Sequence, residues 1–237
     1  MTITHLRRKS PMDYEEYLQM RQRQVRHWLH SNIPLANSIT NEAFSKILLL
    51  SIIDCFAQAN AGYNVHHTTD AFCDFVLSYS SQSKVLNYIC PVTLGYDYDL
   101  KPSLEDGMLY SIDDPYLAQE GERLLLKLPE SKREKAKRKH RYVGLLYATR
   151  NKLVHELNTL GHQIDYMNGK PTIAQGSLVD YVDGKIAQIK EWSPYFPKKY
   201  IYDLTIETVY TYLDHCDSEK KMIAPIETRK SRYSWYD

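Results

Sequence analysis

The fold class is decided by one segment, NEAFSKILLLSIIDCFAQANAG, at residues 41–62. Its apolar residues recur every three or four positions, as on one face of a helix, and Thr40 or Asn41 is suited to cap the first turn. The expected apolar face consists of Phe44, Ile47, Leu48, Ser51, Ile52, Cys55 and Phe56, ending before Gly62. The apolar run at 47–53 is far shorter than the ~20 residues that span a bilayer. We therefore predict a central core helix in a mainly α protein.

Helical spacing of apolar residues also occurs on both sides of this segment. We expect helices at residues 11–29, at 69–88 with a break near Ser80 and Ser81, at 115–128, at 131–160 and at 202–215. The helix at 131–160 is expected to be the longest. Residues 92–111 are expected to form a long loop, because the pattern weakens there and includes glycine and proline.

The spacing changes after Gly161. Asn168-Gly169 and Asp183-Gly184 are strong signals for tight hairpin turns, and alternating apolar residues flank them. A small antiparallel β-hairpin insertion is therefore expected near the C-terminal third. The predicted organisation is a helical domain at 10–160, a β-hairpin embellishment at 161–200, a helix at 201–216 packing back on the bundle, and a loosely attached tail at 218–237.

Cysteine usage and charge point to a cytoplasmic protein. The four cysteines are Cys55, Cys73, Cys90 and Cys216, with no Cys-x-x-Cys pair, and the formal net charge is +1. Scattered cysteines of this kind are expected to be reduced core residues. The segment after the basic start is polar and acidic, where a secretory signal needs an apolar run. Export and a membrane location are not expected.

Two histidine pairs invite a metal-site interpretation. His27-x-x-His30 and His66-His67 both lack a nearby cysteine or a suitably spaced acidic partner. Surface histidines are the better interpretation, so no metal is expected. The sequence also has no glycine-rich phosphate loop, no dinucleotide-binding fingerprint and no Ser-His-Asp order. No cofactor is expected.

The charges are unevenly distributed along the chain. An acidic segment at 97–130 is followed directly by a basic one. The basic residues are Lys132, Arg133, Lys135, Lys137, Arg138, Lys139 and Arg141. Such a stripe can bind RNA phosphates even when the net charge is near zero, although a solvated helix face is the alternative.

The most informative residues lie near the end of the 131–160 helix. Arg150 falls on the same stripe as Leu146, Leu153 and Leu157, and an arginine there is costly without a partner or a water-lined cavity. Asn151 and His155 are four residues apart, so their side chains are able to hydrogen-bond. A structural alternative is that Arg150 bridges to an acid such as Asp54 and that His155 is a helix C-terminal cation.

Arginine and histidine together suit one kind of chemistry. Histidine is able to move a proton near neutral pH, and arginine is able to bind phosphate oxygens through several donors. With no evident metal ligands, this pair suits cleavage of RNA by its own 2′-hydroxyl. Arg150 and His155 lie about 140° apart around one helix axis, so two copies of the helix across a two-fold axis would form the site more easily than one.

The segment Arg150-Asn151-Lys152-Leu153-Val154-His155 resembles the signature of the HEPN superfamily: an arginine, a polar residue, three further residues and a histidine, on a late helix of a helical bundle. Residues 48–54 also look like the apolar core helix of bacterial members. The resemblance implies a homodimer with a composite site, no metal, and RNA cleavage that leaves 2′,3′-cyclic phosphate ends.

In this resemblance Arg150 and His155 are the catalytic residues and Asn151 is an orienting residue. Many members are toxins or anti-phage defence proteins, so an antitoxin or regulatory partner is an accompanying expectation. Other members have lost activity or bind partners. The alternative function is therefore a catalytically silent helical module that binds a protein or nucleic acid.

Overall fold

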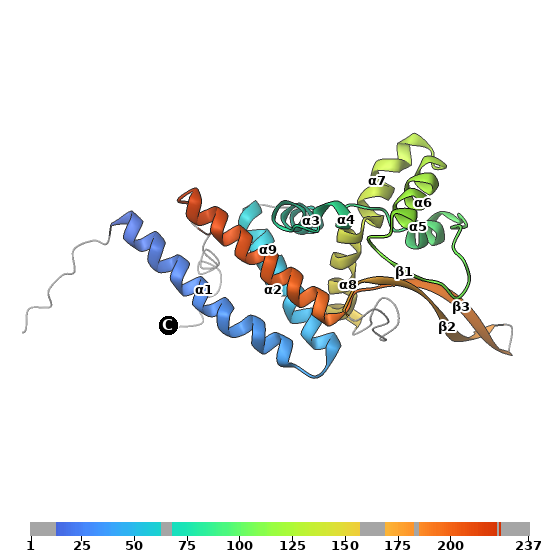
Figure 1. Ribbon diagram of the computed structural model, residues 1–237, viewed down its shortest axis with the longest axis horizontal. Coiled ribbons are helices and arrows are strands. Elements are labelled where there is room, and N and C mark those ends of the chain that lie inside the picture. The colour runs from blue at the N-terminus through green and yellow to red at the C-terminus, as the bar shows by residue number, and fades with distance from the viewer. Residues whose placement is uncertain (1–12, 63–67, 157–168, 183–184, 222, 224–237) are drawn as a thin grey trace, which may run out of the picture.

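The computed structural model describes residues 13–62, 68–156, 169–182, 185–221 and 223, with the backbone alone described at 155–156, 177–182 and 185–190. The described residues form nine helices and one three-stranded antiparallel sheet. The predicted mainly α fold with a small β insertion is thus confirmed. Figure 1 shows long helices at one end of the molecule and the sheet extending from the other.

Three long helices lie side by side (Figure 1): α1 (Tyr14–Ser38), α2 (Glu42–Ala61) and α9 (Lys198–Ser218). The expected cap of α2 is Asn41, whose side chain accepts a hydrogen bond of 3.2 Å from the backbone N–H of Phe44. The helix ends at Gly62, where φ is 83°, a conformation that glycine adopts without strain. Both ends of the central helix agree with the sequence-based prediction.

The remaining helices are α3 (Thr68–Tyr79), α4 (Ser83–Leu86), α5 (Pro91–Tyr98), α6 (Pro115–Leu126), α7 (Glu130–His140) and α8 (Tyr142–Glu156). The break after α3 was predicted: the side chain of Glu207 on α9 accepts hydrogen bonds from Ser80 Oγ and from the backbone N–H of Ser81. The prediction of a long loop at 92–111 is wrong in part. Pro91 is the first residue of α5, and residues 109–111 form a strand.

The expected apolar face of α2 is wrong in part: Ile52 and Phe56 are buried as predicted, but Phe44 and Leu48 are not. Phe44 and Leu48 are 50% and 44% exposed, whereas the neighbouring Leu49, Leu50 and Ile53 are fully buried. The reason is tertiary: α1, α3, α8 and α9 all pack against α2, so a wide arc that includes polar residues is covered. Lys46 and Asp54 are among the buried residues.

The expected single helix at 131–160 is two helices. Arg141 separates α7 from α8 with an extended backbone, φ −63° and ψ 146°. Around this break Cys90 donates its backbone N–H to the carbonyl of His140, and Tyr142 donates to the carbonyl of Tyr88, while Ile89 and Arg141 form a β-bridge. The basic segment is therefore on a different helix from Arg150.

The sheet consists of β1 (Leu109–Ser111), β2 (Thr172–Val182) and β3 (Lys185–Tyr195) in the order β1-β2-β3. Val182 pairs with Lys185 and the antiparallel register continues to Thr172 and Tyr195, which confirms a hairpin at the position predicted from Asp183-Gly184. Those two residues and most of the Asn168 region lie outside the described residues. Ile173 and Phe196 join the helical core, so the base of the hairpin and the bundle share one core.

Residues 91–140 build a smaller second layer from α5, α6 and α7. Its apolar contacts are Ile89, Leu94, Leu124, Leu125, Leu128 and Ala136. Among the described helices, none is long and apolar enough to cross a membrane.

Candidate active site on helix α8

Arg150 is held by two side chains. Its Nη2 lies 3.1 Å from Oδ2 of Asp54 on α2, and its Nη1 donates a hydrogen bond of 2.9 Å to Oδ1 of Asn151. Gln58 donates a further hydrogen bond of 3.0 Å to the same Asp54 oxygen. Arg150, which lies on a stripe of leucines, thus has the acidic partner that its position requires. That partner is Asp54, the acid expected if Arg150 has a structural role.

The guanidinium is not saturated by these contacts. Arginine has five N–H donors, and its hydrogen bond to Asn151 uses one of them, while its contact with Asp54 is an ion pair. Nε of Arg150 and Oδ1 of Asp54 are buried without a hydrogen-bond partner among the described residues. The Arg150 side chain is 23% exposed, against 4% for Asp54. The arginine therefore has donors left for another group.

The structure brings together part of the predicted site. Arg150 and Asn151 are in direct contact, whereas sequence reasoning had paired Asn151 with His155. The backbone of α8 continues through His155, but the histidine side chain lies outside the described part of the chain. The contact between Asn151 and His155 stays a prediction.

Exposed apolar side chains lie on α1, α2 and α8. The helices around α2 pack on one another in the order α8, α3, α9 and α1. The first and last of them, α8 and α1, are not among the described helix pairs that pack extensively. Among the described residues, no helix packs extensively over the side of α2 between α1 and α8. We call five exposed apolar residues of these three helices the apolar strip: Trp28, Leu35, Phe44, Leu48 and Val154.

The position of the apolar strip follows from helix geometry. Arg26 marks the side of α1 that faces α9, because its Nη2 contacts Asp214 and Asp217. Leu35 is rotated by about 180° from Arg26 around α1, so it lies on the flank away from α9. Val154 is one turn after Arg150 and 41% exposed. Through Val154, the strip thus comes within one helical turn of Arg150.

Comparison with family models, with curated proteins and with solved structures finds no match for this chain.

Two of the basic residues of α7 are used within the fold. Arg133 donates to the backbone carbonyls of Leu126 and Leu128, which caps the C-terminus of α6. Lys139 forms an ion pair with Asp97 on α5. These two side chains are structural, which their spacing in the sequence did not reveal.

The remaining basic residues are more available. Arg138 lies 3.7 Å from Asp70, and Arg141 donates to Asn87. Lys132 and Lys135 are exposed and Lys137 is half-buried, and these three lysines have no ion-pair partner among the described residues. A smaller basic surface than predicted is left on α7.

His140, at the end of α7, is a buried titratable group that the sequence analysis did not single out. Its Nδ1 lies 3.1 Å from Oγ1 of Thr93, and its Nε2 lies 3.2 Å from Oδ2 of Asp97. Burial lowers the pKa of His140 to about 4 despite the nearby carboxylate. The ring is therefore neutral at physiological pH and links α7 to α5.

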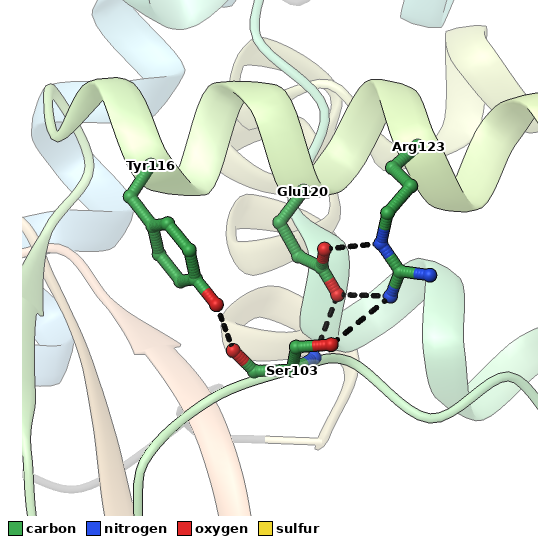
Figure 2. Close-up of polar contacts among 4 residues, drawn as sticks. All are labelled: Ser103, Tyr116, Glu120 and Arg123. Atoms are coloured by element: carbon green, nitrogen blue, oxygen red, sulfur yellow. Dashed lines mark hydrogen bonds and ion pairs between the residues drawn. The ribbon is translucent and has the colours of Figure 1, made fainter.

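A second buried acid lies on α6 (Figure 2). Glu120 accepts two hydrogen bonds from Arg123, of 2.5 and 2.6 Å, and one of 2.6 Å from the backbone N–H of Ser103. Tyr116 donates to the carbonyl of Ser103. Burial opposes ionisation, but these donors outweigh it and lower the pKa of Glu120. The cluster fastens the segment before β1 to α6.

An open groove of about 510 Å³ lies beside this cluster. It is lined by Tyr88, Ala118, Gln119, Glu122, Arg123 and Leu126. The groove does not reach Arg150 or Asn151. Within the residues that the structure describes, no group of three His, Cys, Asp or Glu side chains is placed to hold a metal ion. His27 and His30 are exposed on α1, and His66 and His67 lie outside those residues.

Proposed function

We propose that the protein is a metal-independent endoribonuclease. It cleaves RNA by attack of a 2′-hydroxyl on the adjacent phosphorus, expels the 5′-oxygen of the next nucleotide, and leaves a 2′,3′-cyclic phosphate. The observation that supports it best is the partly exposed guanidinium of Arg150, held by Asp54 and Asn151 beside the apolar strip.

Each proposed catalytic residue has a separate role. Arg150 supplies its remaining N–H donors to the phosphate oxygens, where negative charge increases in the transition state. His155 transfers a proton to or from the reacting oxygens, a role that suits a group titrating near neutral pH. Asn151 helps to fix the arginine, with which it is in contact.

The proposed enzyme is a homodimer. A single straight helix holds Arg150 and His155 about 140° apart, which is unfavourable for binding one phosphate from both. A two-fold interface through the apolar strip would bury five exposed apolar side chains and bring the two α8 helices together. The lysines of α7 would bind the RNA backbone on either side of this site.

The biological setting that accompanies this proposal is a cytoplasmic toxin or an anti-phage defence effector. It rests on the resemblance of the α8 motif to HEPN proteins. An antitoxin or another regulatory protein would restrain such an enzyme in the cell.

A second function is favoured by one observation. The ion pair between Arg150 and Asp54 is the contact that a purely structural arginine would make. A catalytically silent helical module, which binds a protein or nucleic acid through the apolar strip or α7, is therefore the competing proposal.

The test is cleavage of a mixed RNA pool by the purified protein in excess chelator. We expect the wild type to cleave, His155→Ala to lose cleavage, and the new 3′ ends to be cyclic phosphates. Equal cleavage by both proteins would indicate a contaminating nuclease. Absence of cleavage by both, with RNA or protein binding retained, would favour the silent module.

A further inference from the structure

We propose that Asp54 is a positioning residue for Arg150: its buried carboxylate fixes the orientation of the guanidinium so that Nη donors remain available to another group. This inference rests on the proposed ribonuclease function. It assigns to α2, the central core helix, a part in the site on α8.

The contact between Asp54 and Arg150 is asymmetric. Only one oxygen of Asp54 contacts Arg150, and the same oxygen accepts the hydrogen bond from Gln58. Asn151 holds Nη1, the other end of the guanidinium. Two anchors at different nitrogens define the plane of the group, while its remaining hydrogens stay free.

Another buried carboxylate of the molecule, Glu120, pairs with its arginine in a different geometry. Arg123 uses both Nε and Nη2 to bind both oxygens of Glu120, and Ser103 completes the set (Figure 2). That pair has the two-pronged geometry that gives arginine and carboxylate their strongest interaction. Glu120 and Asp54 are equally buried, at 4% side-chain exposure, yet the Asp54 pair is single-pronged. Maximal pairing is thus achieved at Glu120 and not at Asp54.

This arrangement leaves buried polar atoms unpaired. Oδ1 of Asp54 and Nε of Arg150 are buried without a partner among the described residues, and an unpaired buried polar atom is destabilising. Arg123 and Glu120 pair the corresponding atoms, so stability alone favours the two-pronged geometry. Because the Asp54 pair stays single-pronged, the Nη donors of Arg150 that contact neither Asp54 nor Asn151 remain available to a phosphate.

The main test compares Asp54→Asn with Glu120→Gln, which neutralises an equally buried, arginine-paired carboxylate outside the site. We expect Asp54→Asn to lower kcat by about 10- to 100-fold with KM changed less than about twofold, because the arginine keeps its charge but loses its fixed orientation. Glu120→Gln should leave both constants within about twofold. Unchanged kcat in folded Asp54→Asn, or a change in KM alone, would overturn the inference.

Two further measurements separate the outcomes. If Asp54→Asn does not fold, Asp54→Glu keeps the charge one methylene further out and should also lower kcat. The second is NMR of the arginine side chains, which does not need activity. A fixed guanidinium in the wild type should give separate Arg150 Nη–H signals, because rotation about the Nε–Cζ bond is slow. These signals should be averaged in Asp54→Asn and stay separate in Glu120→Gln.

The NMR result also distinguishes this inference from the proposed function. If the wild type does not cleave RNA but Arg150 is fixed by Asp54, the ribonuclease proposal fails and the positioning contact stands. If Arg150 rotates equally freely in wild type and Asp54→Asn, the positioning inference fails whether or not RNA is cleaved.

Discussion

Arg150 shows how one charged residue is accommodated at the edge of a core. Its side chain is mostly buried, and its charge is compensated by Asp54 on a different helix. Because Asp54 is almost fully buried, it depends on the arginine more than the arginine depends on it. Substitutions at the two positions should therefore have unequal consequences for stability.

Arg150→Ala should lower the free energy of unfolding by about 2 kcal/mol, less than the 3–5 typical of a fully buried pair, because Arg150 is partly exposed. Arg150→Lys should cost less, since a positive charge remains near Asp54. Both variants should lose RNA cleavage. Urea unfolding measures the first effect, and the added change Asp54→Ala should restore part of the stability lost in Arg150→Ala. No loss in Arg150→Ala would show that the ion pair is not formed.

His140 should determine part of the response of the fold to acid. Its pKa is about 4 in the folded chain and near 6.5 in an unfolded one, so the unfolded state takes up the proton first. The stability due to the neutral ring is present above about pH 6.5 and is lost as the pH falls towards 4, by on the order of 3 kcal/mol in all.

The measurement is thermal unfolding of wild type and His140→Gln between pH 7.5 and 4.5. The variant should be less stable at pH 7.5, and its melting temperature should fall less over the range. Parallel curves for the two proteins would mean that His140 does not titrate in this window.

At the scale of elements, local patterns predicted most of the helices and both ends of α2, but not the break between α7 and α8 or the full buried face of α2. Asn41 and Gly62 mark the ends of α2 in the sequence because capping and positive φ are local properties. The break at Arg141 is invisible locally, because backbone contacts with residues 88–90 create it. For the same reason, the spacing of apolar residues predicted one helix where the structure has α7 and α8.

The candidate site was predictable to a similar extent. The motif on α8 singled out Arg150 and Asn151, and the cost of an arginine among leucines called for an acidic partner. The sequence did not show which basic residues at 132–141 have a structural role and which are available to bind RNA. The roles of Arg133 and Lys139 depend on α6 and α5, whose positions against α7 follow from tertiary packing.

The unpaired lysines of α7 should contribute to RNA binding. Replacing Lys132, Lys135 and Lys137 with glutamine should weaken binding and reduce the slope of log affinity against log salt by about 2, since each phosphate contact to single-stranded RNA contributes about 0.7. The control replaces Lys84, Lys101 and Lys221, which are exposed elsewhere, and should leave the slope unchanged. An equal effect of both triple variants would indicate non-specific charge only.

At the scale of the whole molecule, the arrangement of helices around α2 explains why an apolar surface is left open. Four helices cover α2, and the side between α1 and α8 has no cover from the described residues. The sequence analysis had assigned Phe44 and Leu48 to the core, because apolar spacing does not distinguish a core face from an interface. A dimer through the apolar strip would explain why Phe44 and Leu48 are exposed in the single chain.

Phe44→Glu and Leu48→Glu should therefore produce monomers, because a charge would be buried in the interface. Leu126→Glu is the matched control: Leu126 is 63% exposed on α6, away from the strip, and its substitution should leave the dimer intact. Light scattering over a range of concentrations measures the result. A monomeric wild type at high concentration would contradict the dimer.

The central claim, a ribonuclease site shared by two copies, is tested most directly by mixing inactive variants. Arg150→Lys and His155→Ala are each expected to be inactive alone. After unfolding and refolding together, half of the dimers should be mixed, and each should contain one site with an intact arginine and an intact histidine. We predict that cleavage returns to about a quarter of the wild-type rate. A mixture as inactive as its components, beside an active wild type, would contradict the shared site.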